Sequence, residues 1–286
     1  MTAGPALLEI GDDGVAVITL NRPENRNGWN PDMENRYFDL LDEADRDAQV
    51  RVVIVTGAGR TFCPGVDSGR LDRLAGQPLD MSDRPRSPAY PWAIRKPMIA
   101  AINGACAGMG LVQALLCDVR FVARGARFTT AFARRGLAAE FGITWLLPRI
   151  VGIGTASDLL ISGRVFDAEE ALELGVVNQV VEPEDLMSVA RAYARDLAAN
   201  CSPLSMALMR HQLRLDARSD FETALSRAYR AMGYAAEAAD FREGIDSFLQ
   251  KRAADFPALR DDVDPRAITD ARLGEVELRP ADALLR

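Results

Sequence analysis

Short, fully apolar segments that stop at glycine-containing turns constrain the fold of this chain more than any other feature. Val52–Thr56 (VVIVT) is followed by Gly57-Ala58-Gly59, and Met98–Ile102 (MIAAI) is followed by Asn103-Gly104. Segments this short are typical of strands, and an apolar side chain at every position requires cover on both faces. The pattern therefore predicts a parallel sheet that is buried on both sides.

Helical patterns alternate with these strands. Val15–Leu20 and Val119–Ala123 are two further predicted strands, and Pro31–Ala48 carries apolar residues at helical spacing. Asn30 suits the N-cap of that helix, and Pro31 suits its first turn. Additional helices are predicted at 168–174, 183–199, 203–215, 220–234 and 238–252, with one strand at 176–181. The alternation predicts an α/β fold that becomes mainly helical beyond residue 145.

Between the second and third strands, Gln77–Pro91 is rich in Pro, Ser, Asp and Arg. Such a composition predicts a long loop, and long loops in compact domains are often lids or binding elements. The segment is therefore a candidate for part of a ligand site.

Composition excludes several classes of function. The 286 residues carry a net charge of −7, whereas a nucleic-acid binder needs a basic face. No apolar run reaches the roughly 18 residues of a membrane span, and Met1–Ile10 lacks the features of a secretory signal. The spacing of Cys63, Cys106, Cys117 and Cys201 matches neither a disulfide framework nor, with the single His211, a metal site. We therefore expect a cytoplasmic protein without bound metal.

Two glycine-containing segments are the strongest candidates for chemistry. Phe62–Asp67 places a Pro-Gly turn after a strand, and Asn103–Gly110 consists of small residues that open a helix. Free N–H groups at a helix N-terminus attract negative charge, and two that converge on one oxygen would stabilise an oxyanion. The same glycines also suit tight turns and close helix–sheet packing. The residues alone leave both interpretations open.

These two segments belong to a larger set that resembles the crotonase (enoyl-CoA hydratase/isomerase) superfamily. The matching segments are Ile18–Pro23 with Arg26-Asn27, Thr56–Asp67, Lys96–Gly104 with Ala107–Gly110 and Cys117-Asp118, Leu147–Gly152, Gly175–Val177 and Glu243–Ile245. The resemblance covers roughly residues 7 to 256, and the segments follow one another in the family's order. It implies an α/β crotonase-like spiral of β-β-α units at 1–200, a C-terminal helical trimerisation region at 201–256, and a charged tail at 257–286.

The resemblance also implies a ligand and a site. The ligand is an acyl-CoA thioester, so that coenzyme A enters as part of the substrate and no other cofactor is needed. The partners implied are further copies of the chain, in a homotrimer or a hexamer. By position, the N–H groups of Val66 and Met109 form an oxyanion hole. The other binding positions implied are Arg26, Asn27, Gly28, Trp29, Gly65, Asp67, Gly108, Gly110, Val112 and Phe132, with Phe248 and Lys251 reaching the CoA of a neighbouring subunit.

The chain departs from the family where a hydratase carries its two catalytic glutamates. Those positions hold Val112 and Phe132, and neither side chain can transfer a proton. Glu140 stands instead where dienoyl-CoA isomerases and 4-chlorobenzoyl-CoA dehalogenases carry a catalytic aspartate. Its apolar neighbours suit a proton shuttle because desolvation disfavours the charged form, although Arg134 and Arg135 would act in the opposite direction. Glu140 also suits a purely structural role at the start of a following helix.

The resemblance therefore predicts an acyl-CoA-processing enzyme that works through a thioester enolate. A double-bond isomerase fits a single carboxylate best, because one group then removes a proton and returns it elsewhere. A divergent hydratase would additionally have to position a water molecule. Two alternatives stay open, a non-catalytic acyl-CoA carrier that has lost the acids and an acyl-CoA hydrolase in which Glu140 activates water.

Overall fold

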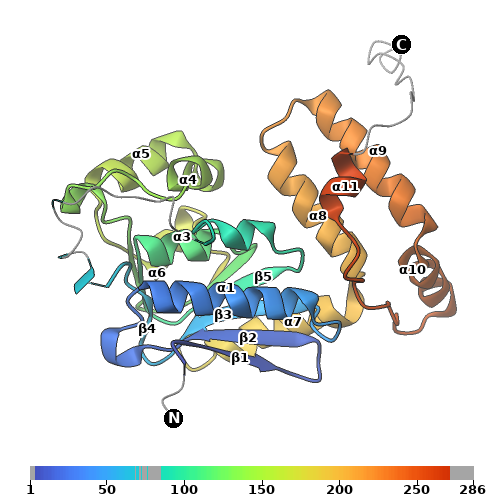
Figure 1. Ribbon diagram of the computed structural model, residues 1–286, viewed down its shortest axis with the longest axis horizontal. Helices are drawn as coiled ribbons and strands as arrows, with labels where there is room; N and C mark the ends of the chain where they lie inside the picture. Colours follow the sequence, from blue (N-terminus) through green and yellow to red (C-terminus); the bar gives the residue numbers. More distant parts are fainter. Residues whose placement is uncertain (1–3, 68, 71, 73–75, 77–84, 271–286) are drawn as a thin grey trace. The chain divides into compact units, whose positions relative to one another are not determined.

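The computed structural model describes residues 4–67, 69, 70, 72, 76 and 85–270 (Figure 1). The chain divides into two compact units, residues 1–201 and 202–286, and each has an apolar core of its own. Of the predicted long loop, 77–84 lie outside the described residues, and the part that follows ends in the short helix η2 (Tyr90–Ala93).

The first unit is built on a main sheet of strands that are nearly all parallel, as predicted. In order across the sheet they are β1 (Ala6–Ile10), β2 (Val15–Leu20), β3 (Val52–Gly57), β5 (Met98–Ile102), β7 (Val119–Ala123) and β10 (Gln179–Val181). Only β1 runs antiparallel to its neighbour. Every residue of β3 and β5 is buried, which explains why these two strands are apolar except at Thr56, whose hydroxyl donates to the Ala101 carbonyl (2.8 Å).

Both faces of the main sheet are covered (Figure 1). Val52 and Ile54 of β3 pack with Ala190 and Ala194 of α7 (Leu186–Asn200), where small side chains allow the helix to approach. Val53 and Val55, which alternate with them, belong to a larger cluster that includes α1 (Pro31–Arg46). The predicted cap of α1 is confirmed, because the Asn30 side chain accepts a hydrogen bond from the Met33 N–H (2.9 Å).

A second sheet was not apparent from the sequence. It contains β4 (Thr61–Cys63), β6 (Ala105–Ala107), β8 (Arg127–Thr129) and β9 (Phe166–Asp167) in that order. The strands β4, β6 and β8 directly follow β3, β5 and β7 in the chain, and the two sets pair in the same order. Each turn of chain therefore adds one strand to each sheet, which is the repeating unit of the predicted spiral.

Helices complete both units. In the first unit they are η1 (Pro23–Asn25), α3 (Met109–Leu115), η3 (Ala133–Arg135), α4 (Ile143–Val151), α5 (Ile153–Ser162) and α6 (Ala168–Glu173). The second unit contains α8 (Pro203–Asp216), α9 (Phe221–Glu237), α10 (Ala239–Gln250) and α11 (Pro265–Asp270). Part of the predicted tail packs here, since Leu259 and Val263 join Leu204 and Leu208 in a small core. None of the helices in the described ranges combines the length and apolar character that crossing a membrane requires.

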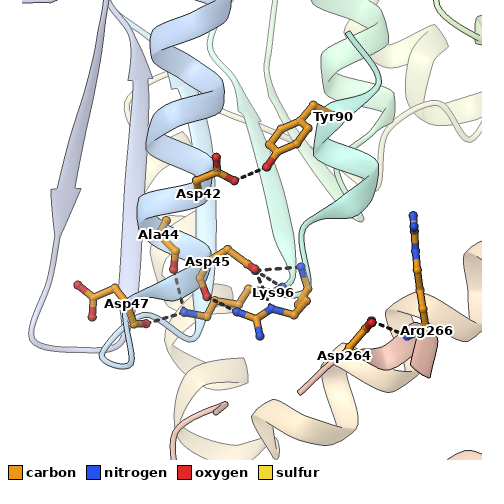
Figure 2. Close-up of polar contacts among 9 residues, drawn as sticks. Asp42, Ala44, Asp45, Asp47, Tyr90, Lys96, Asp264 and Arg266 are labelled. Atoms are coloured by element: carbon orange, nitrogen blue, oxygen red, sulfur yellow. Dashed lines mark hydrogen bonds and ion pairs between the residues drawn. The ribbon is translucent and has the colours of Figure 1, made fainter. Parts of the chain in front are cut away.

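The C-terminal end of α1 is fixed to the chain before β5 by a buried lysine (Figure 2). Lys96 is 2% exposed and donates to the carbonyls of Ala44 (2.8 Å) and Asp47 (2.5 Å), which end the helix. The Asp45 carboxylate accepts from the Arg95 Nε (2.8 Å), and Tyr90 donates to Asp42. A positive charge at a helix C-terminus also interacts favourably with the helix dipole.

Replacing Lys96 with Met is expected to lower the free energy of unfolding by about 2 kcal/mol, because the buried Ala44 carbonyl and the partly buried Asp47 carbonyl both lose a charged donor. Urea titration followed by circular dichroism measures the change. Arg127→Met, which alters an exposed arginine on β8, is the control and should change stability by less than about 0.5 kcal/mol. A Lys96→Met protein as stable as the control would contradict the capping role.

Candidate active site

A cavity of about 650 Å³ lies where the two glycine-containing segments meet. Residues from η1, from the turn after β4, from the start of α3 and from the stretch around η3 line it. Its lining includes these predicted site residues: Arg26, Gly28, Gly65, Val66, Asp67, Gly108, Met109, Phe132 and Glu140. Segments far apart in the sequence thus converge on one site within the first unit.

The Val66 N–H points away from Trp29, the residue with which Val66 is paired. Trp29 and Val66 form an isolated parallel bridge, in which the Trp29 N–H donates to the Gly65 carbonyl (2.8 Å) and the Asp67 N–H donates to the Trp29 carbonyl (3.0 Å). The backbone groups of Val66 itself face the opposite side in such a bridge. Within the described residues the Val66 N–H has no acceptor.

The Met109 N–H lies close to the same turn. Met109 is the first residue of α3, so its N–H has no partner inside the helix. Gly65 and Gly108 both have positive φ, +104° and +47°, which glycine adopts without strain. A Cβ placed on Gly65 would lie 3.8 Å from the Met109 nitrogen and 3.2 Å from the Ala107 oxygen. Glycine therefore suits position 65, where both the positive φ and the short distance to the Ala107 oxygen disfavour a side chain.

The carboxylates that line the cavity are Glu24, Asp67 and Glu140. The Asp67 carboxylate accepts from the Arg22 guanidinium (3.2 Å) and from the Gly69 N–H (3.0 Å), so both of its oxygens are engaged. Glu24 lies on η1, beside Asn25 and Arg26, whereas Glu140 follows η3 in the chain and lines the cavity together with Phe132 and Leu137. Glu140 is therefore the lining carboxylate that is nearest to Phe132 in the sequence.

The two positions at which the resemblance implies glutamate in a hydratase, Phe132 and Val112, have different surroundings. The Phe132 side chain lines the cavity and is 5% exposed. Val112 is fully buried in the core and is not part of the lining. Gly110 is not part of it either, because it packs so closely on β4 that a Cβ there would lie 2.1 Å from the Cys63 oxygen. Close helix–sheet packing, one of the two interpretations of these glycines, thus applies at Gly110.

Of the four consecutive binding positions that the resemblance implies, Arg26–Trp29, two line the cavity and two are buried behind it. Arg26 and Gly28 line the cavity, but Asn27 and Trp29 are 0% and 1% exposed and do not. The Asn27 amide donates to the carbonyls of Ala58 (2.9 Å) and Thr61 (2.6 Å). The Trp29 indole donates to the buried Glu34 carboxylate (2.8 Å). The side chains of Asn27 and Trp29 therefore shape the site from behind and do not face it.

Several lining residues were not anticipated from the sequence. They are Glu24, Asn25, Pro64, Thr130, Ala131, Arg135 and Leu137. Ala131 has a positive φ of 63°, which is uncommon for a residue with a side chain and marks a sharp bend beside Phe132. The sequence contains no pattern that predicts this bend. The other predicted residues, Phe248 and Lys251, lie in the second unit, where Phe248 is 82% exposed.

Cys63 adjoins the cavity without being available for chemistry. Its thiol is fully buried and lies 3.8 Å from the Gly65 carbonyl, which it faces as a donor. Burial raises the pKa of Cys63 to about 12, although the Gly65 hydrogen bond and the charge of Arg22 act in the opposite direction. Burial likewise raises the pKa of Cys106. Protonated thiols are poor nucleophiles, so covalent thiol catalysis is excluded for these two residues.

Comparison with known proteins identifies the family to which this chain belongs. The family model for enoyl-CoA hydratase/isomerase matches residues 11–258. A 1,2-epoxyphenylacetyl-CoA isomerase from Escherichia coli is 36% identical over 251 residues, which cover 86% of this chain and 95% of that protein. The chain therefore belongs to the enoyl-CoA hydratase/isomerase family, as the sequence motifs predicted, and is an enzyme of that family.

Solved structures agree with this assignment. A probable enoyl-CoA hydratase/isomerase from Mycobacterium abscessus has a TM-score of 0.83 at 30% identity, covering 90% of this chain and 100% of that one. An enoyl-CoA hydratase from Mycobacterium marinum has a TM-score of 0.66 at 47% identity, covering 76% and 100%. The predicted crotonase-like fold is thereby confirmed.

The burial of the cysteines predicts how the folded protein responds to a thiol reagent. Of the four cysteines, Cys63, Cys106 and Cys117 are buried and Cys201 is half-buried. We expect Ellman's reagent at pH 8 to react with no more than one thiol in the folded protein, and with all four in guanidinium chloride. Cys201→Ser should abolish the reaction of the folded protein. Rapid modification of Cys63, located by mass spectrometry, would show that burial does not protect it.

Proposed function

We propose that this enzyme converts an acyl-CoA thioester through an enolate, with Val66 and Met109 as the oxyanion hole and Glu140 as the acid–base group. The support is that Val66 and Met109, whose backbone N–H groups have no acceptor in the described residues, line a cavity that Glu140 also lines. Two such donors on one carbonyl oxygen stabilise the charge that develops when a neighbouring carbon loses a proton. Donation by the backbone is compatible with any side chain, so Val and Met are suitable at these positions.

Double-bond isomerisation is the reaction we favour. The Glu140 carboxylate would take a proton from one carbon of the acyl chain and return it to another, so that no second reactant is required. Phe132 and Val112 cannot supply the two carboxylates with which a hydratase holds and activates a water molecule. The isomerase among the relatives acts, by its name, on an epoxide and so does not decide between these reactions, and the hydratase among the solved structures keeps hydration as the competing reaction.

The proposal includes the binding of CoA and assembly. Arg26 lines the cavity and belongs to the stretch that the family resemblance places beside the adenine and pantetheine part of CoA. No metal or redox cofactor is required, because the backbone donors activate the carbonyl.

A trimer or hexamer fits the exposed apolar face of α10, where Phe241, Ile245, Phe248 and Leu249 follow helical spacing. A cytoplasmic location suits four cysteines that form no disulfide bond in the structure.

A non-catalytic acyl-CoA carrier is the second candidate, and the apolar Val112 and Phe132 are the observations that favour it. A pocket that retains the oxyanion donors without a competent acid would bind a thioester and leave it unchanged. The two functions differ in what happens to the bound ligand, so the same experiment separates them.

We expect the wild-type protein to convert at least one member of a panel of enoyl-, dienoyl- and aryl-CoA thioesters, monitored by absorbance and mass spectrometry. Glu140→Gln should lower kcat at least about a hundredfold, because the amide cannot accept the proton. A product of unchanged mass identifies isomerisation, a product heavier by one water identifies hydration, and free CoA identifies hydrolysis.

Glu173→Gln, which alters an exposed carboxylate on α6, is the control and should retain full activity. Full activity in Glu140→Gln as well would remove Glu140 from the mechanism. Tight binding of thioesters without conversion by the wild-type protein would establish the carrier.

A further inference from the structure

The turn that carries the Val66 N–H has little backbone support of its own. Val66 lies outside both sheets and is held to Trp29 by an isolated bridge of two hydrogen bonds. Gly65, with a φ of +104°, precedes it and imposes no conformation through a side chain. A donor that must point at one oxygen atom needs a firmer support than this.

Arg22 supplies a link across the bridge. Its guanidinium donates through one nitrogen to the Gly28 carbonyl, directly before Trp29, and through the other to the Asp67 carboxylate (3.2 Å), directly after Val66. The two sides of the bridge are thus joined by one planar, forked group. The Arg22 and Asp67 side chains are only 15% and 23% exposed, so solvent screens their attraction less than that of a surface pair.

The surroundings fix Arg22 itself. Its backbone N–H donates to the Asn27 side-chain oxygen (2.9 Å), and its carbonyl accepts from the Asn27 N–H (2.8 Å). Asn27 in turn donates to the carbonyls of Ala58 and Thr61, on either side of the turn between β3 and β4. The fully buried Asn27 therefore anchors Arg22 to the sheet strands that lead into the Val66 turn.

We propose that Arg22, acting through Asp67 and the Gly28 carbonyl, is the positioning residue that aims the Val66 N–H at the thioester oxygen. This inference rests on the proposed oxyanion hole and adds to it a residue that never touches the ligand, since Arg22 is not part of the cavity lining. It also assigns the Asp67 carboxylate to the same link, as a group that receives Arg22 and not as an acid or base.

The test uses a signal that reports on the carbonyl alone. A conjugated thioester such as cinnamoyl-CoA absorbs at longer wavelength when its carbonyl oxygen accepts strong hydrogen bonds, so the red shift on binding measures polarisation without turnover. Arg22→Lys retains the charge but loses the fork that reaches two acceptors at once. Asp67→Asn, which removes the charged acceptor, is a second variant in case Arg22→Lys does not fold.

Arg95→Lys is the matched control. Arg95 also bonds a carboxylate (Asp45, 2.8 Å) and a backbone carbonyl (Asp45, 3.0 Å), and its side chain is 13% exposed, but it does not line or adjoin the Val66 turn. A general loss of stability would appear in both Arg95→Lys and Arg22→Lys, whereas a loss of carbonyl polarisation would appear only in Arg22→Lys.

We expect Arg22→Lys and Asp67→Asn to lose at least about half of the red shift and to lower kcat about tenfold, with the Kd for the thioester changed less than about threefold. Arg95→Lys should keep the full red shift. A full red shift and unchanged kcat in both variants would overturn the proposal, as would a loss of thioester binding in place of polarisation. Absence of any red shift in the wild-type protein would instead refute the oxyanion hole itself.

Discussion

The close approach of two backbone segments is the constraint on which the site depends. The turn after β4 and the start of α3 meet without side chains between them, at Gly65, Gly108 and Gly110. The spiral of β-β-α units produces this meeting, because it sets β4 beside β6 and so brings the residue after each strand to the same edge. A methyl group at Gly110 would lie 2.1 Å from the Cys63 carbonyl oxygen. A change of side-chain rotamer cannot relieve this overlap, because the backbone fixes the positions of both atoms.

Activation of a carbonyl by backbone donors leaves the side chains of the site free to change. Such donors act in any member of the fold that keeps the two segments in contact, and the acid–base groups decide which reaction follows. The family resemblance assigns the two hydratase glutamate positions to Phe132 and Val112 of this chain, and these two apolar residues have different surroundings. Phe132 shapes the cavity wall, whereas Val112 packs in the core. In the mechanism we propose, the chemistry depends on Glu140 and on the precision with which the two N–H groups are held.

The main sheet was predictable because its strands are continuous apolar runs, and β2, β5 and β7 coincide with the predicted segments. The second sheet was not, since strands of two or three residues such as β9 and β4 carry too few residues to show a period. Motifs also located the cavity, but not which side chains face it. Positive φ at Arg26 and Asn27 turns the chain so that the Asn27 side chain points inward, a consequence of tertiary contacts that no local pattern reveals.

Enolate formation is the central claim, and incorporation of deuterium from solvent tests it most directly. The wild-type protein would be incubated in D2O with each CoA thioester that it binds, and recovered ligand would be analysed by mass spectrometry and NMR. The account predicts deuterium on carbons of the acyl chain conjugated with the thioester, at a rate that Glu140→Gln abolishes. A tightly bound thioester that gains no deuterium after prolonged incubation would contradict it and leave a protein that only carries its ligand.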